Sequence, residues 1–155
     1  MKDRKMIKYK LTGKDKFGLY RIIAARSFGN VKAGDMGGRI SGEHNLSHSG
    51  DAWVGGNATV RDNATVRDNA TVRGNATVRG FATVRENATV SDNATVRGNA
   101  WVRDNATVRD NATVSGFATV SDNATVSGFA TVSDNTWVSD NATVSGFATV
   151  SDNAT

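Results

Sequence analysis

A valine stands at every sixth position from residue 54 to residue 150, without a single slip. The series consists of Val54, Val60, Val66, Val72, Val78, Val84, Val90, Val96, Val102, Val108, Val114, Val120, Val126, Val132, Val138, Val144 and Val150. In an α-helix, residues six apart point about 240° away from each other, so these side chains would scatter around it. The period instead indicates a repeat architecture, in which each unit buries its apolar side against its neighbours.

Each six-residue unit, or hexad, reads as one short strand followed by one corner. The unit is Val-Arg/Ser-Asp/Gly-Asn/Phe-Ala-Thr, and Ala precedes each valine by two residues from Val60 onward, except for Thr136 before Val138. In an extended Ala-Thr-Val-Arg segment, Ala and Val point inward, and Thr and the Arg or Ser point to solvent. The Asp-Asn or Gly-Asn that follows is typical of a turn, since Asn and Gly tolerate a positive φ and Asp bonds nearby backbone. Three such sides close a triangular coil, so each coil consists of three hexads.

This unit resembles the repeat of hexapeptide-repeat proteins, in which an aliphatic residue is followed four positions later by a small one. The resemblance covers residues 54–155 and implies an all-β fold, a left-handed parallel β-helix with just under six regular coils. The spacing "F..VKAG..GG......NLS..G..W" resembles the N-terminal part of YdcK-like hexapeptide-repeat proteins of bacteria and prophages, whose function is not established. We therefore expect a β-rich cap over residues 1–39, with strands IKYKL and LYRIIAA, and a solenoid over 40–155 that is regular from 54.

The composition narrows the function classes. Cysteine is absent, which excludes disulfides and thiolate metal sites, and hydrophobic residues reach 38% with only 7% aromatic, so the core must use small side chains. The start MKDRKMIKYKL lacks the apolar core of a secretory signal, and no stretch is long enough to span a membrane. We expect a cytoplasmic protein of bacterial or phage origin, without a cofactor, a bound metal or a membrane partner.

Charge is distributed unevenly along the chain. Residues 1–50 carry 11 Lys and Arg against 4 Asp and Glu, whereas residues 115–155 carry 4 Asp and no basic residue. This polarity favours head-to-tail self-association through the solenoid ends, or an anionic partner at the basic end. The simpler explanation of the uneven charge is that charged residues only keep the protein soluble. The chain stops at Thr155 without a segment that resembles a second cap, so either a further segment or a partner protein is expected there.

Acyl transfer is the enzymatic alternative, because many hexapeptide-repeat proteins use a histidine base in a cleft between subunits. Only His44 and His48 are available, and the valine spacing leaves no protruding loop after Val54. A general base needs a shaped pocket around it, and we expect both histidines to be exposed polar residues of the cap. The prediction is a protein without catalysis, acting as a rigid scaffold or binding surface.

A second alternative is binding to ice or another crystalline surface. With three hexads per coil, one face carries an unbroken threonine column made of Thr59, Thr77, Thr95, Thr113, Thr131 and Thr149. Beside it stand Arg61, Arg79 and Arg97, and then Ser115, Ser133 and Ser151. Thr also suits outward strand positions for general reasons. On another face Trp101 and Trp137 are expected to lie two coils apart, with Trp53 on a different one, and Phe129 is expected to stack on Phe147 at one corner.

Nucleic acid is not an expected partner. Arg67, Arg85 and Arg103 would form a column beside Trp101, which suits phosphate binding. However, Asp62, Asp68, Asp104 and Asp110 lie one residue from an arginine and make the surface nearly neutral. The recurring Asn-Ala-Thr triplet matches a glycosylation acceptor, but without a signal peptide we interpret it as a corner Asn, an inward Ala and an outward Thr.

Overall fold

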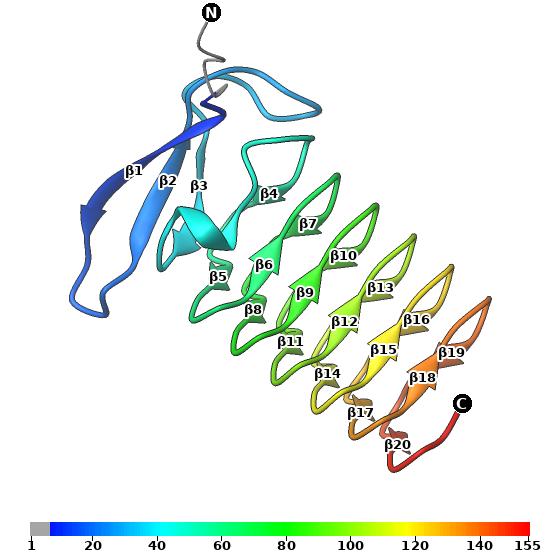
Figure 1. Cartoon of the computed structure of the whole chain (residues 1–155). Helices are drawn as coiled ribbons and strands as arrows, with labels where there is room; N and C mark the ends of the chain where they lie inside the picture. Colours follow the sequence, from blue (N-terminus) through cyan, green and yellow to red (C-terminus); the bar gives the residue numbers. More distant parts are fainter. Residues whose placement is uncertain (1–6) are drawn as a thin grey trace, which may run out of the picture.

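The computed structural model describes residues 7–155, and this part of the chain is all-β apart from one 3-10 turn, η1 (Glu43–Asn45). Seventeen two-residue strands, β4 to β20, stack into three parallel sheets that form a solenoid of about six turns (Figure 1). Strand partners lie three hexads apart in the sequence, as in Thr59↔Thr77 and Val60↔Val78. The predicted fold class is therefore confirmed.

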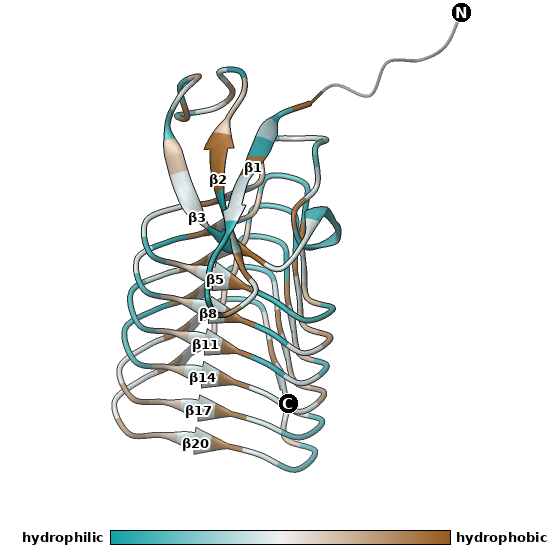
Figure 2. Cartoon of the chain, turned by 90° about the vertical axis from the view of Figure 1, so that its left-hand side faces the viewer, coloured by the Kyte–Doolittle hydropathy of each residue, from teal (hydrophilic) through white to brown (hydrophobic). Residues whose placement is uncertain are grey.

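The three sheets form the three sides of the solenoid. The sheet that we call the threonine face contains β5 (Thr59–Val60), β8 (Thr77–Val78), β11 (Thr95–Val96), β14 (Thr113–Val114), β17 (Thr131–Val132) and β20 (Thr149–Val150). The aromatic face contains β6 (Thr65–Val66), β9 (Thr83–Val84), β12 (Trp101–Val102), β15 (Thr119–Val120) and β18 (Trp137–Val138). The groove face contains β4 (Trp53–Val54), β7 (Thr71–Val72), β10 (Thr89–Val90), β13 (Thr107–Val108), β16 (Thr125–Val126) and β19 (Thr143–Val144). In Figure 2 the strands of the threonine face run from left to right while successive coils descend, so the winding is left-handed.

The valine and alanine columns form the core. The valines from Val54 to Val138 are at most 4% exposed, and the alanines from Ala58 to Ala130 are fully buried. Val144 and Val150 are only half-buried, because no further coil of this sequence covers the last one. Thr136 replaces an inward alanine, and its hydroxyl donates a 2.6 Å hydrogen bond to the carbonyl oxygen of Ser133. That bond explains how a polar side chain is accommodated inside.

The corners differ from the sequence-based expectation in one respect. The residue with a positive φ is not Asn but the residue before it, which is Asp, Glu86 or Gly, as in Asp62 at 60° and Gly74 at 67°. An acidic side chain at this position accepts a hydrogen bond from the backbone N–H of the equivalent corner in the next coil. The bonds of this kind run from the N–H groups of Gly80, Glu86, Asp104, Asp110, Asp122, Gly128, Asp140 and Asp152.

The position after each valine is also less uniform than predicted. Ser91, Ser115, Ser121 and Ser127 are buried rather than solvent-facing. In two of them the short side chain folds back on the corner, where the hydroxyl of Ser91 lies 3.2 Å from the carboxylate of Asp92 and that of Ser121 lies 3.2 Å from Asp122. An arginine at the same position is long enough to reach past the corner.

The N-terminal cap is a three-stranded antiparallel meander, β1 (Tyr9–Lys14), β2 (Tyr20–Ala24) and β3 (Met36–Ile40). Strand β3 also pairs in parallel with β5, so the cap extends the sheet of the threonine face (Figure 2). The predicted boundary between residues 39 and 40 lies inside β3, and cap and solenoid share one continuous sheet. The first six residues of the predicted cap lie outside the described part of the chain.

Candidate binding faces of the solenoid

The threonine face carries the six threonines singled out from the sequence. The pairings place Thr59, Thr77, Thr95, Thr113, Thr131 and Thr149 in one unbroken column with no shift of register. The first five are half-buried and Thr149, in the last coil, is exposed. The column begins below Arg39 of β3, which pairs with Thr59. This face is a one-dimensional lattice of hydroxyls with the strand spacing of about 4.8 Å.

The aromatic face carries the two exposed tryptophans that the sequence places on one face. Trp101 and Trp137 both pair with Thr119, so they lie two coils apart in one column, and they are 40% and 51% exposed. The guanidinium of Arg85 lies 5.0 Å from the centre of the Trp101 ring. Trp53 lies on the groove face, as the three-hexad period predicts. At a separate corner, Phe129 and Phe147 stack with ring centres 5.2 Å apart, which confirms the predicted pair.

The arginine column beside these tryptophans is balanced by acidic groups. Arg103 forms an ion pair with Asp104 at 3.1 Å, and Arg109, on the groove face, pairs with Asp110 at 3.4 Å. Most other acidic residues of the solenoid occupy corner positions, where their carboxylates accept backbone N–H groups. Across residues 7–155, no three His, Asp or Glu side chains gather closely enough to hold a metal ion. The same residues contain no helix of the length and apolarity needed to cross a bilayer.

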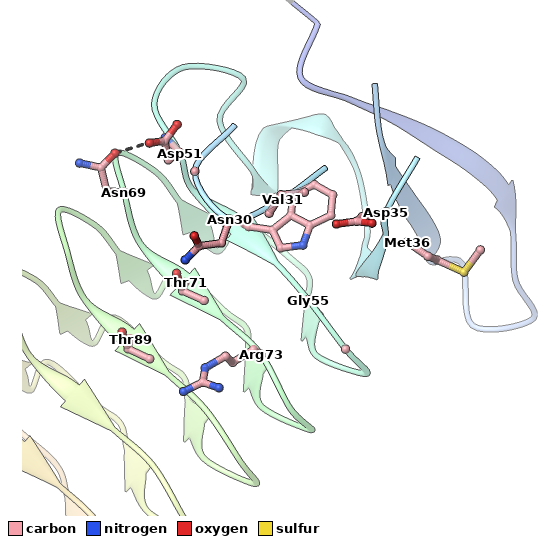
Figure 3. Close-up of a pocket in the computed structure, with 13 residues that line it drawn as sticks. Asn30, Val31, Asp35, Met36, Asp51, Gly55, Asn69, Thr71, Arg73 and Thr89 are labelled. Atoms are coloured by element: carbon pink, nitrogen blue, oxygen red, sulfur yellow. Dashed lines mark hydrogen bonds between the residues drawn. The ribbon is translucent and has the colours of Figure 1, made fainter. Parts of the chain in front are cut away.

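The groove face includes a depression that the sequence does not predict. A groove of about 700 Å³ lies where the cap loop with Asn30 and Asp35 overhangs Trp53, Thr71 and Arg73 (Figure 3). Trp53 is only 8% exposed, and its indole packs edge-on against Phe28. The groove mixes carboxylates, amides and one guanidinium. Cap residues 30–36 reach it only through the tertiary fold, which explains why no local sequence signal marks it.

The two histidines have different environments, and His48 corrects the expectation that both are exposed. His48 is 7% exposed and stacks on Tyr9 with ring centres 4.2 Å apart. Its Nδ1 accepts the backbone N–H of Lys8 at 3.1 Å, so Nε2 carries the proton and faces Glu43 Oε1 at 3.3 Å. His44 is exposed, and its Nε2 lies 2.7 Å from the carbonyl oxygen of Asp62. The ring nitrogens of His48 are thus occupied by groups of this chain.

Lys8 is the most unusual ionisable group of the cap. Its side chain is buried, and Nζ donates a 2.6 Å hydrogen bond to the carbonyl oxygen of Ala52. Burial lowers the pKa of Lys8 to about 8, with a further lowering from the positive charge of Arg26, while Asp51 opposes the shift. Burial and the charge of Glu43 raise the pKa of the neighbouring Tyr9 well above its usual value.

This shift predicts that the free energy of unfolding rises with pH between 8 and 10. In that window Lys8 of the unfolded chain holds a proton that the folded protein has released, so increasing pH favours the folded state. The gain should be about 2 kcal/mol between pH 8 and pH 10, measured by urea denaturation. The raised pKa of Tyr9 makes the free energy of unfolding fall with increasing pH, but only above about pH 10, the usual pKa of a tyrosine. Lys8→Met should abolish the slope and the exposed Lys10→Met should retain it; an equal slope in both variants would contradict the assignment.

Comparison with known proteins does not assign the chain to a family. No model of a known protein family matches this sequence, and no curated protein sequence matches it. The outward side chains on the three faces of the solenoid are therefore the basis for inferring its function.

Proposed function

We propose that this protein is a non-catalytic binding scaffold that lays one flat face against an extended or repetitive partner. The three-hexad coil and the cap segment support a relationship to the hexapeptide-repeat proteins, and to their YdcK-like bacterial and prophage members. In this proposal the function lies in the outward columns, and the valine and alanine core only holds those columns rigid.

One observation carries the proposal, namely the perfect register of the solenoid. From β5 to β20, each strand pairs with its equivalent in the next coil so that Val lies on Val and each outward side chain on the equivalent outward side chain. A surface whose groups repeat at about 4.8 Å along a straight axis suits a partner that is itself periodic. Catalysis has less support, because both ring nitrogens of His48 already have partners within this chain and several serines beside the corners are buried.

Binding to ice is the second candidate, and the unbroken threonine column favours it. Six threonines in register form a regular array of hydroxyl and methyl groups. Ser133 and Ser151, two residues farther along in the last two coils, add half-buried hydroxyls, whereas the expected third member, Ser115, is buried. The aromatic face lacks such an array because Trp101 and Trp137 interrupt its threonines.

The test is retention of the folded protein on a panel of periodic solids, consisting of microcrystalline cellulose, chitin, calcium carbonate and a growing ice surface. We expect salt-resistant retention on at least one member, and no retention of the heat-unfolded chain. Retention on ice together with thermal hysteresis would select the second candidate. Retention on none of the solids, or turnover of a thioester acyl donor that His44→Ala abolishes, would overturn the scaffold proposal.

A further inference from the structure

Two phenylalanines extend the tryptophan pair of the aromatic face into a longer stripe. Phe81 and Phe117 occupy the corner that precedes this face, two residues before Thr83 and Thr119. The side chain of the intervening alanine points inward, so each phenylalanine stands on the same outward side as the following threonine. The aromatic stripe is thus Phe81, Trp101, Phe117 and Trp137, one residue in each of four successive coils, with exposures from 40% to 63%.

The stripe has a period of two coils. Successive members are separated by one coil plus two positions, one coil minus two, and one coil plus two, so the aromatic group alternates between the corner and the strand. Like residues therefore recur after two coils, Phe81 with Phe117 and Trp101 with Trp137. Two coils correspond to about 10 Å, which is also the length of the disaccharide repeat in an extended β-1,4-linked glycan. In such a glycan alternate sugars are turned over, so the same sugar face recurs once per disaccharide.

The surroundings of the stripe are electrically balanced. Each arginine of this face is followed directly by an acidic residue, giving Arg67-Asp68, Arg85-Glu86 and Arg103-Asp104, and the last pair is in contact at 3.1 Å. Glycine follows Arg79 and Arg97 at the corner of the phenylalanines, but Asp122 and Asp140 of the aromatic face follow serines and offset these two charges. Arg85 also lies over the Trp101 ring. Single-stranded nucleic acid would require an excess of positive charge along the stripe, whereas a neutral ligand with flat C–H faces requires only the rings. Thr83 and Thr119, half-buried between the aromatic positions, add hydroxyls that can bond a sugar.

We propose that the aromatic stripe binds a neutral β-1,4-linked polysaccharide chain that lies parallel to the solenoid axis. The rings of the stripe stack on the apolar faces of alternate sugars, and the rigid backbone ladders hold the rings at the spacing of the disaccharide. This inference rests on the proposed binding function and adds the face, the residues and the ligand class.

The repeat itself supplies a matched pair of variants. Residues 67–72 and residues 103–108 both read Arg-Asp-Asn-Ala-Thr-Val, so deleting either gives chains of identical length and composition. Deleting 67–72 moves the whole stripe together to the neighbouring face and leaves it intact. Deleting 103–108 moves only Phe117 and Trp137, which splits the stripe between two faces. The deletions affect the threonine column differently, since deleting 67–72 separates only Thr59 from it, whereas deleting 103–108 splits it between Thr95 and Thr113. The double substitution Trp101→Thr with Trp137→Thr leaves this column unchanged, so it separates a loss of the stripe from a loss of the column.

The measurement is the retardation of each folded variant in native gels containing hydroxyethyl cellulose, together with depletion by insoluble cellulose. We expect the parent and the 67–72 deletion to bind alike, and the 103–108 deletion to bind at least about tenfold more weakly. Trp101→Thr with Trp137→Thr, which restores the ordinary hexad, should lose binding to a similar extent and serves if a deletion fails to fold.

Four results would overturn the proposal. The first three are equal glycan binding by the two deletion variants, stripe-dependent binding of a single-stranded oligonucleotide in place of the glycan, and a dimer in sedimentation that only the split stripe dissociates. Retention of all variants on ice or another solid, with no binding to cellulose, would refute the glycan proposal and leave the scaffold function standing.

Discussion

Val102→Asp is expected to unfold the middle coils of the solenoid and to lower the free energy of unfolding by at least about 4 kcal/mol. Val102 is fully buried in the valine column of the aromatic face, between Val84 and Val120. The inward residues around it are alanines and valines, so an aspartate there would have neither a cation nor a hydrogen-bond donor from a side chain. Because each coil contacts only its neighbours, the damage should spread to adjacent coils while the cap stays folded.

Val150→Asp is the matched control, since it changes the same position of the hexad in the half-buried last coil. That variant should lose less than about 1 kcal/mol, because its charge stays hydrated. Urea denaturation gives the two values, and hydrogen exchange locates the loss of protection. Val102→Asp melting at the same temperature as the parent would contradict the structure of the core.

The second large effect is expected at the junction of cap and solenoid, where Gly38→Val should separate the two. A Cβ at Gly38 would clash with the carbonyl oxygen of Ala58 and lie 2.9 Å from a methyl group of Val54. That carbonyl accepts the hydrogen bond from the Arg39 N–H which joins β3 to the first coil. Since the obstacle is backbone, no rotamer change relieves it, and the cost should be at least about 3 kcal/mol.

Limited proteolysis should then cleave within residues 7–40 while the coils from residue 59 onward stay protected. Gly13→Ala is the control, because an added Cβ there meets nothing within 4 Å and φ is not positive. It should be neutral or stabilising by about 0.5 kcal/mol. A Gly38→Val protein whose cap resists proteolysis as well as the parent would show that the β3–β5 junction is not the attachment point.

The coil could be predicted from the sequence because its contacts are periodic. Once the six-residue interval requires three sides, residues three hexads apart must meet, and this alone placed Trp101 and Trp137 on one face and Phe129 against Phe147. The aromatic stripe follows from the same period, because its members are spaced alternately by one coil plus two residues and one coil minus two residues. It is recognised only when corner positions and strand positions are considered together.

The corner conformation was only half predictable. The turn was evident from the Asp-Asn and Gly-Asn pairs, yet the positive φ falls on Asp62 and its equivalents rather than on Asn63. At the earlier position a carboxylate reaches the N–H of the equivalent corner in the next coil, as Asp62 reaches Gly80 at 3.2 Å. Glycine corners such as Gly74 adopt the same conformation without that bond. Propensity for a positive φ is similar for Asn and Asp, so local preference does not tell which of the two residues adopts it.

The interval of six residues was enough to predict the winding unit, the buried columns and the residues that share each face, since its repetition from Val54 to Val150 places every valine on the inward side of its strand. The burial of His48, the lowered pKa of Lys8 and the groove beside Trp53 depend instead on contacts between the cap and the first coil. Those features join residues far apart in the sequence, as Lys8 joins Ala52 and Tyr9 joins Leu46. No period connects such segments, so their meeting follows from how the cap packs on the first coil.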